Sequence, residues 1–468
     1  MAVAPSAVVY GAGNIGRGFI GMLLAQSGYA VTFIDVDSGL VAALNERGGY
    51  TVRTPAAGSI DGTNFASAAA YSTNAASGST NAASYSTNAT TDTIVENISA
   101  IDGSDTEAAA AAVAAADIMA VSVGARALPM IAPVIAEGVR RRKSTSGLPL
   151  DILICENLAG ANEKLAEWLA SEGGLPEHTI RESVGLVETA IARMIPVQDI
   201  SANGGDPLTI SAEAYAFLPV DGGAFKCGLP DIVGMIPCEN FEGYVSRKLY
   251  VHNMGHAVCA YLGMLDGCKY IYDATGNGDI RYIAQSAMLE SARALAAEYG
   301  LPLDSLLVHI ADLIKRFSDT SLAFSCERAG ADTARKLGGS DRFIGAARLC
   351  GKHGMPSAFI EAGAAGALHR HMGGASENGS EGISMTGGMT RGMTGREGQN
   401  GEASVTGSGR PIEAARLALK DMSGLTDASS IDKSILDGIM RKYQLLGSGD
   451  IGELARASAL EAARLPVV

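Results

Sequence analysis

Short apolar runs alternate with longer helical patterns in the first half of the chain. Four runs have the length and composition of buried strands, and polar or glycine-rich turns follow them: Ala7–Tyr10, Ala30–Ile34, Ile118–Val123 and Ile152–Cys155. Apolar residues at helical spacing lie between several of these runs. Because strands that alternate with helices form parallel sheets, the first half is predicted to be an α/β domain with a Rossmann-type, doubly wound sheet.

The pattern changes to helical spacing from about Glu239 onward. Glycine and proline separate four segments that are predicted to be helices: Val245–Leu262, Ile280–Tyr299, Leu306–Phe317 and Arg342–Leu349. The second half is therefore predicted to be a mainly α-helical substrate domain. We place the nucleotide-binding domain at residues 1–203 and the helical domain at residues 204–468.

Two segments interrupt this globular pattern. Residues 57–93 consist mostly of Ala, Ser, Thr, Asn and Gly, and the tetrapeptide Ser-Thr-Asn-Ala recurs at positions 72, 79 and 86. Residues 373–409 are rich in Gly, Ser and Thr. Because neither segment can bury much apolar surface, both are predicted to be flexible surface loops, and a functional lid is the alternative.

The composition excludes several classes of protein. A formal net charge of −14 argues against a nucleic-acid partner, and the single compact basic run, residues 140–143, is interpreted as a solvated loop after a helix. Seven cysteines without a CxxC pair suggest reduced thiols. Because the amino terminus lacks a signal peptide and no run of about 18 apolar residues follows, we expect a cytoplasmic protein without a membrane partner. Its oligomeric state is expected to be a monomer or a homodimer.

A glycine-rich turn follows the first predicted strand. Gly11, Gly13 and Gly16 form the pattern GxGxxG, and Asp35 closes the second predicted strand. In such turns the backbone approaches a pyrophosphate, and a carboxylate after the second strand binds a ribose 2′-hydroxyl and repels a 2′-phosphate. We therefore predict a site that favours NAD over NADP. Its residues are Gly11, Ala12, Gly13, Asn14, Ile15, Gly16, Asp35 and Gly124.

A second group of polar residues lies far downstream. Lys248, His252 and His256 are four residues apart and Asn253 adjoins them, so on a helix they share one side. Oxidation of a secondary alcohol needs a base for the hydroxyl proton and donors for the developing carbonyl oxygen. A lysine with a lowered pKa can be that base. The spacing alone also fits a merely solvated helix.

The two histidines also have the spacing of a zincin-type metal site. In that motif a glutamate general base follows the first histidine, whereas this chain has Asn253 after His252. Since an amide cannot take up the proton, we predict no metal site.

Several motifs resemble the polyol-specific long-chain dehydrogenases, the mannitol dehydrogenase family. They are GAGNIGRGFIG at residues 11–21, Cys-Glu-Asn at 155–157, Val-Gly-Leu-Val at 184–187 with Arg193 beyond it, and RKLYVHNMGHAVCAYLG at 247–263. The resemblance extends from Val8 to the carboxyl-terminal helices and excludes the two insertions. Its most specific part is the last of these motifs.

The resemblance implies a reversible, metal-independent oxidation of D-mannitol 1-phosphate to D-fructose 6-phosphate with NAD. It implies that Lys248 is the general acid/base, that Asn157 and Asn253 hold the reacting oxygen, and that His256 orients the substrate. His252 is not part of this set, because the family generally has an apolar residue there. We interpret His252 as a local packing change.

The sequence departs from the family pattern at several positions. Ala192 stands where the family usually has an aspartate, and Ala331 and Thr333 replace an expected arginine and proline within a segment that keeps Arg-Lys-Leu at 335–337. These changes affect contacts to the polyol or phosphate. Arg17 and Arg193 are assigned to the substrate, although Arg17 can also contact cofactor phosphate or brace the second domain through a carboxylate.

Two other functions stay open. One is a related hexitol or hexuronate oxidoreductase with an unphosphorylated substrate, which resembles a mannitol 2-dehydrogenase or a fructuronate reductase. The other is a catalytically silent NAD-binding regulatory protein, which the alanine at position 192 suggests. We expect the small-molecule sugar phosphate to bind in the cleft between the two predicted domains.

Overall fold

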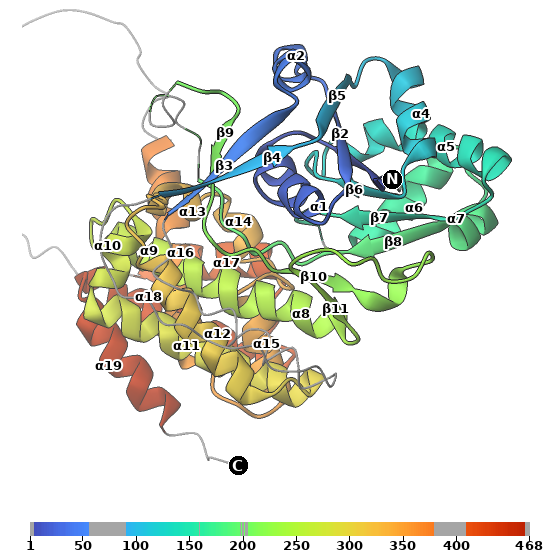
Figure 1. Ribbon diagram of the computed structural model, residues 1–468. Helices are drawn as coiled ribbons and strands as arrows, with labels where there is room; N and C mark the ends of the chain where they lie inside the picture. Colours follow the sequence, from blue (N-terminus) through green and yellow to red (C-terminus); the bar gives the residue numbers. More distant parts are fainter. Residues whose placement is uncertain are drawn as a thin grey trace, which may run out of the picture. The chain divides into compact units, whose positions relative to one another are not determined.

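The computed structural model describes residues 4–55, 90–158, 160–196, 198, 201, 205–378 and 409–463. The chain divides into two compact units, Met1–Val245 and Ser246–Val468 (Figure 1). The first unit continues past the predicted boundary at residue 203, because later strands of the chain pair within it.

A six-stranded parallel sheet forms the centre of the first unit. Its strands lie in the order β5-β2-β1-β6-β7-β8, and every neighbouring pair is parallel. This order confirms the predicted doubly wound sheet. The bounds are β1 Ser6–Tyr10, β2 Ala30–Asp35, β5 Ile98–Asp102, β6 Ile118–Val121, β7 Leu150–Ile154 and β8 Val184–Glu188.

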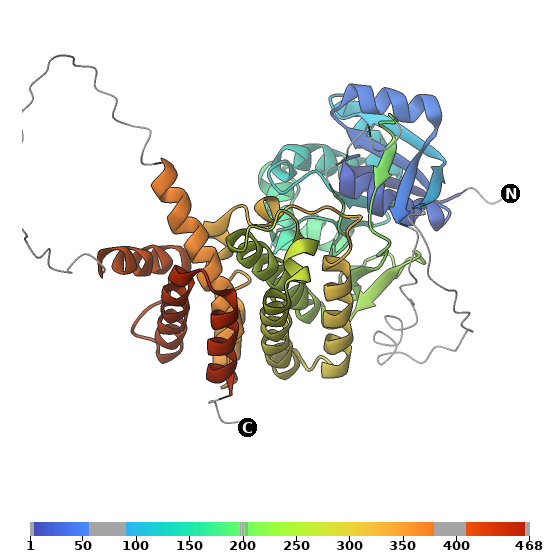
Figure 2. The same ribbon diagram turned by 90° about the vertical axis from the view of Figure 1, so that its left-hand side faces the viewer.

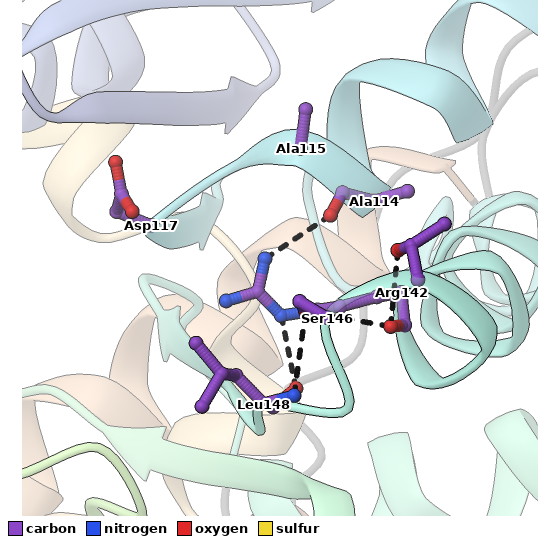
Figure 3. Close-up of a pocket in the computed structure, with 7 residues that line it drawn as sticks. Ala114, Ala115, Asp117, Arg142, Ser146 and Leu148 are labelled. Carbon is purple, nitrogen blue, oxygen red and sulfur yellow. Dashed lines mark hydrogen bonds between the residues drawn. The ribbon is translucent and has the colours of Figure 1, made fainter. Parts of the chain in front are cut away.

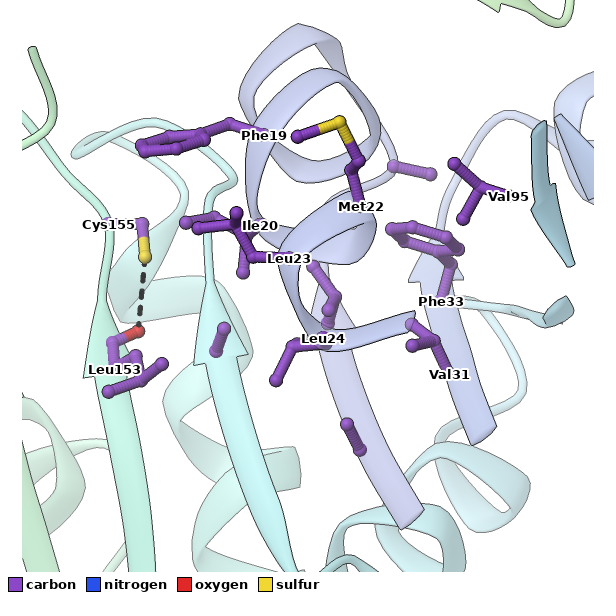
Figure 4. Close-up of a cluster of buried hydrophobic side chains, with 14 of the residues drawn as sticks. Phe19, Ile20, Met22, Leu23, Leu24, Val31, Phe33, Val95, Leu153 and Cys155 are labelled. Atoms are coloured by element: carbon purple, nitrogen blue, oxygen red, sulfur yellow. Dashed lines mark hydrogen bonds between the residues drawn. The ribbon is translucent and has the colours of Figure 1, made fainter. Parts of the chain in front are cut away.

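Helices cover both faces of this sheet because successive strand residues point to opposite sides. Val9 lies in the core that contains residues of α1 (Met22–Gln26) and α2 (Ser38–Arg47). Figure 4 shows the part of this core around Met22, Leu23 and Leu24 of α1. The neighbouring Val8 lies in the core on the other side. The helices of that side are α4 (Thr106–Ala115), α5 (Leu128–Thr145), α6 (Ala161–Ser171) and α7 (Glu177–Ser183).

Smaller sheets complete the first unit. One has the order β4-β3-β9, and another pairs β10 with β11. The bounds are β3 Gly49–Pro55, β4 Thr90–Glu96, β9 Thr209–Ser211, β10 Leu218–Asp221 and β11 Met235–Cys238, and a 3₁₀ turn covers Gly222–Ala224. The end of the predicted insertion at 57–93 is therefore part of β4, and its residues 57–89 lie outside the described residues.

The basic run at residues 140–143 is helical and not a loop, since it belongs to the last turns of α5. Arg141 forms ion pairs with Glu107 and Glu137. Arg142 is buried, and its guanidinium donates to the carbonyl oxygens of Ala114, Ala116, Leu148 and Pro149. The run thus ties α5 to the end of α4.

The second unit is helical, as predicted. The predicted segment at residues 245–262 is one continuous run of α8 (Phe241–Arg247), the π-helical η3 (Lys248–Asn253) and α9 (Met254–Leu265), and the division between the two units falls within α8. The other predicted helices correspond to α11 (Gly278–Tyr299), α12 (Leu303–Phe317) and α15 (Ile344–Lys352). Shorter helices are α10 (Ile271–Gly276), α13 (Cys326–Ala329) and α14 (Thr333–Lys336).

Four further helices that we did not predict complete the second unit. They are α16 (Ala358–Asn378), α17 (Gly409–Ser423), α18 (Ser430–Leu445) and α19 (Ile451–Ala462), and a 3₁₀ turn covers Leu446–Ser448. Helices α16, α18 and α19 lie side by side (Figure 2). Buried Lys442 of α18 forms ion pairs with Glu361 of α16 and Glu461 of α19. Because α16 extends to Asn378, the predicted insertion begins later than residue 373; residues 379–408 lie outside the described residues.

Candidate active site

The turn after β1 needs glycine at two of its three motif positions. Gly11 has a φ of +99°, and a Cβ there would lie 2.5 Å from the carbonyl oxygen of Ser122. A Cβ at Gly16 would overlap the carbonyl oxygen of Gly11. Gly13 is exposed, and a Cβ there would meet no atom within 4 Å. Gly11 and Gly16 therefore build the turn, whereas Gly13 keeps its outer side open for a phosphate-bearing ligand.

This turn lies where the strand order reverses, since β2 and β6 flank β1. Ser122 follows β6 and donates its hydroxyl to the carbonyl oxygen of Gly11 at 3.1 Å. Gly124 follows with a φ of +86°, and its N–H donates to Oε1 of Glu156 at 2.8 Å. Burial raises the pKa of Glu156. Ligands of open α/β sheets bind at this reversal point, outside the carboxyl ends of the strands.

Asn157 belongs to the same edge of the sheet. It follows β7, is exposed, and directly succeeds Glu156. Because β1, β6 and β7 are parallel, their carboxyl ends meet at one edge. The structure therefore brings the glycine turn, Gly124 and Asn157 to one side of the first unit.

The helix that follows the turn begins with an unusual backbone. Residues Gly16–Gly21 are π-helical before α1 continues the run. Ala12 is buried, Asn14 is exposed, and Ile15 packs partly buried against the core. Stretches of π-helix are frequent at functional sites, where they shift side chains and backbone groups out of the regular helical arrangement.

Asp35 connects the end of β2 to the glycine turn. Its Oδ2 accepts a hydrogen bond from the N–H of Ala12 at 2.6 Å, and its Oδ1 accepts one from the N–H of Asp37 at 3.0 Å. The carboxylate is half-buried. It thus stands beside the turn, at the position from which a carboxylate reaches the ribose of a dinucleotide.

We expect Asp35→Asn to weaken discrimination against NADP. The amide keeps an acceptor for the N–H of Ala12 but removes the charge that repels a 2′-phosphate. The ratio of kcat/KM for NADPH to kcat/KM for NADH is expected to rise about tenfold, which corresponds to about 1.4 kcal/mol. The matched control is Asp304→Asn, at an exposed position in the first turn of α12. An unchanged ratio in the Asp35 variant would remove this role.

Arg17 is buried within the first unit at 8% exposure. Its Nε donates to the carbonyl oxygen of Ala12 at 2.7 Å, and one terminal nitrogen donates to that of Pro207 at 3.3 Å. Burial lowers its pKa, and nearby Asp35, Asp37 and Asp206 oppose that effect. In this arrangement Arg17 fastens the glycine turn to the segment before β9, and its assignment to a phosphate stays a prediction.

Arg193 is also buried, at 4% exposure. Its Nε donates to the carbonyl oxygen of Glu213 at 2.9 Å, and its guanidinium lies 5.5 Å from the centre of the Phe19 ring. Burial lowers its pKa to about 10. These contacts pack Arg193 inside the first unit, beside half-buried Ala192, and its assignment to the substrate stays a prediction.

Lys248 and Asn253 are the first and last residues of η3 in the second unit. A π-helical turn pairs residues five apart, which is the spacing of these two residues. Both are half-buried. The stretch Lys248–Asn253 is thus π-helical, like Gly16–Gly21 in the first unit. The predicted general base and a predicted oxygen-binding amide lie at its two ends.

His256 lies one turn later, in α9. Its ring centre is 5.2 Å from that of Phe317 and 6.1 Å from that of Phe324. Burial, followed by the charges of Arg342, Lys336 and Arg316, lowers its pKa to about 4. The imidazole is therefore uncharged at neutral pH and can both donate and accept a hydrogen bond.

Two basic side chains beside His256 were not assigned from the sequence. Arg342 donates to the carbonyl oxygen of Asn253 at 3.2 Å and forms an ion pair with Asp341. Lys336 is buried and donates to the carbonyl oxygens of Ala329 and Ala331. Burial, Arg342 and Arg335 lower the pKa of Lys336 to about 8. The Arg-Lys-Leu run at 335–337 was the available signal.

Two departures from the family pattern, Ala331 and Thr333, lie next to these groups, whereas the third, Ala192, lies beside Arg193 in the first unit. Ala331 supplies a carbonyl oxygen to Lys336. Thr333 begins α14, and its hydroxyl oxygen accepts a hydrogen bond from the hydroxyl of Tyr261 at 3.3 Å. These two changes therefore lie in the segment that carries Lys336, whose amine donates to backbone carbonyl oxygens of the same segment.

A surface pocket of about 400 Å³ lies elsewhere in the first unit. Figure 3 shows Arg142 between Ala114, Ser146 and Leu148, with Asp117 nearby. The guanidinium already binds carbonyl oxygens at the ends of α4 and α5. None of the predicted site residues lines this pocket, so it has no part in the candidate active site.

Within the described ranges, no group of three or more His, Cys, Asp or Glu side chains is arranged to hold a metal ion. No helix in those ranges is long and apolar enough to cross a membrane.

Two family models together match most of the chain, from residue 5 to residue 401. The family model described as the mannitol dehydrogenase Rossmann domain matches residues 5–234. The model described as the mannitol dehydrogenase C-terminal domain matches residues 240–401. The chain is 32% identical over 365 residues to a mannitol-1-phosphate 5-dehydrogenase of Brevibacillus brevis. The match covers 77% of this chain and 85% of that protein.

Solved structures share the fold at low sequence identity. The mannitol 2-dehydrogenase of Pseudomonas fluorescens, in a ternary complex with NAD and D-mannitol, has a TM-score of 0.68 at 13% identity and covers 98% of this chain and 95% of its own. A D-sorbitol dehydrogenase in substrate-free form has a TM-score of 0.69 at 14% identity, and the match covers 97% of this chain and 95% of that chain. The architecture is therefore that of known polyol dehydrogenases.

Proposed function

Because the chain belongs to the mannitol dehydrogenase family, we propose that it oxidises D-mannitol 1-phosphate reversibly to D-fructose 6-phosphate with NAD. Family membership confirms the resemblance that the sequence motifs indicated. It also confirms that the protein is an oxidoreductase acting on CH–OH groups and that NAD is its cofactor. The phosphorylated substrate and the roles of individual residues are the proposed part.

The positive charge around His256 is the observation that carries the choice of substrate. The positive charges of Arg342, Lys336 and Arg316 lower the pKa of this imidazole. Asp341 forms an ion pair with Arg342, and Asp312 forms one with Arg316 at 3.6 Å, which neutralise part of that charge. An uncharged polyol gains little from such surroundings, whereas a sugar phosphate carries negative charge that these cations stabilise. The 32% identical relative named for the same substrate supports this choice.

The proposed chemistry assigns one task to each residue. Lys248 takes the proton of the substrate hydroxyl during oxidation and returns it when the ketose is reduced. Asn157 and Asn253 donate to the reacting oxygen as its charge develops. His256 orients the substrate through its uncharged imidazole. NAD, when bound, accepts the hydride.

The glycine turn meets the requirements of a dinucleotide. A Cβ at Gly11 or Gly16 would collide with backbone, and Gly13 leaves its outer side open. Asp35 stands at the end of β2 beside that turn. The residues of this chain thus suit NAD, with the pyrophosphate at the turn and the adenosine ribose at Asp35.

We expect purified protein to oxidise NADH, followed at 340 nm, with fructose 6-phosphate and not with fructose or fructuronate. A kcat/KM at least about 100-fold higher for the phosphorylated ketose, or about 2.7 kcal/mol, is the expected result. A preference for an unphosphorylated ketose would favour the related hexitol or hexuronate oxidoreductase. NADH binding without turnover of any of these ketoses would favour the catalytically silent regulatory protein.

A further inference from the structure

On the helical run from η3 to α9, two imidazoles each have one ring nitrogen that lies out of solvent and forms no hydrogen bond within the described part of the chain: Nδ1 of His252 and Nε2 of His256. Buried polar atoms of native proteins are nearly always paired. Because an unpaired one lowers stability, its presence calls for a ligand or a function.

The two rings occupy one side of the same helical run. They lie four residues apart, and both pack against Phe317 of α12, with ring centres at 5.8 Å for His252 and 5.2 Å for His256. His252 belongs to η3, the stretch that also carries Lys248 and Asn253. At 6% exposure it is more than nine-tenths buried. His252 is therefore a direct neighbour of the proposed substrate-binding residues.

The surroundings keep the His252 ring uncharged. Burial lowers its pKa well below the usual value, and Arg316 and His309 of α12 act in the same direction, as do His256 and Lys248 of its own helical run. An uncharged imidazole offers one donor and one acceptor. Hydroxyl groups have the same two capacities, so a polyol is a suitable partner for this ring.

We propose that His252 is a second substrate-binding imidazole beside His256. Its Nδ1 forms a hydrogen bond, as donor or acceptor, with a hydroxyl group of the bound polyol. The inference rests on the proposed function and adds a specificity-determining residue to it. Since the family resemblance implies an apolar residue at this position, the contact is particular to this chain. The substrate supplies the partner that the protein itself lacks at Nδ1.

The test is His252→Leu in the full chain, with NADH and fructose 6-phosphate. KM for the ketose is expected to rise at least about tenfold with a smaller change in kcat, because a binding contact is lost. The Kd of NADH is expected to stay unchanged. The melting temperature is expected to stay equal or to rise, because leucine leaves no unpaired nitrogen in the interior.

Two further variants separate binding from packing. His252→Asn keeps a polar group near the position of Nδ1 and is expected to recover part of the lost affinity. His309→Leu, at a buried histidine of α12, is expected to keep KM within about threefold of the original value. A lower melting temperature of His252→Leu with loss of kcat, and without recovery in His252→Asn, would make His252 a packing residue and overturn the inference.

The outcomes also show separately whether the role of His252 or the proposed reduction of fructose 6-phosphate is wrong. If the unaltered protein reduces fructose 6-phosphate and His252→Leu keeps its KM, only the assignment of His252 is wrong. If the unaltered protein prefers an unphosphorylated ketose, the proposed substrate is wrong, and the same comparison of KM on that ketose decides the role of His252. If it reduces no ketose, both proposals are wrong.

Discussion

Replacing Lys248 by methionine is expected to lower kcat about 10³-fold with both mannitol 1-phosphate and fructose 6-phosphate, since general acid–base groups contribute roughly 10² to 10⁴. Methionine keeps the length of the side chain and removes only the amine. Lys248 begins η3 in the second unit, whereas the glycine turn belongs to the first. The Kd of NADH, followed by fluorescence, is therefore expected to stay within about twofold.

The control is Lys315→Met, which removes an exposed lysine from the last turn of α12. Small primary amines supplied in solution are expected to restore part of the activity of Lys248→Met and none in variants that lack another group, because only the missing base is replaced. A loss of NADH affinity, or a kcat within about threefold of the original, would contradict the assignment of Lys248 as the base.

The sequence predicts the centre of the fold because local patterns determine it. The runs at β1, β2, β6 and β7 are apolar, short and bounded by turns, and all four are strands in the structure. β5 and β8 were missed. Each follows a segment without strong periodicity, and pairing with neighbours distant in the sequence gives these two their strand conformation.

The end of the first unit depends on a contact that no local pattern contains. β9 pairs with β3 across more than 150 residues of chain, so the unit extends past the predicted boundary at residue 203. The same holds for α16, which continues into the glycine-rich segment as far as Asn378. Helix α16 as a whole packs against α18 and α19, and its helical conformation continues into this segment despite the low helix propensity of glycine.

The sequence predicted which residues form the candidate site, but it did not predict the side chains that surround them. Spacing placed Lys248, Asn253 and His256 on one helical run, which the structure has. The π-helical form of that run and the cations beside His256 were not predictable, because Arg316 and Lys336 come from α12 and α14. Those helices approach His256 only in the folded unit. The unpaired nitrogen of His252 belongs to the same non-local environment.

Gly13→Ala is expected to remove cofactor binding without harming the fold. A Cβ at this position meets no protein atom within 4 Å, so the melting temperature of the cofactor-free protein is expected to change by less than about 1 °C. A methyl group on the open side of the turn occupies the space that the pyrophosphate needs. The Kd of NADH is therefore expected to rise about 100-fold, or about 2.7 kcal/mol.

Gly16→Ala provides the contrast, because its Cβ would overlap the carbonyl oxygen of Gly11. This variant is expected to lose both NADH affinity and several degrees of melting temperature, since the backbone of the turn has to move. Gly276→Ala, where a Cβ likewise meets no atom within 4 Å, is the control for the added methyl group. If Gly13→Ala binds NADH normally, the pyrophosphate does not lie against this glycine; if it melts like Gly16→Ala, the open side of the turn is a structural contact instead.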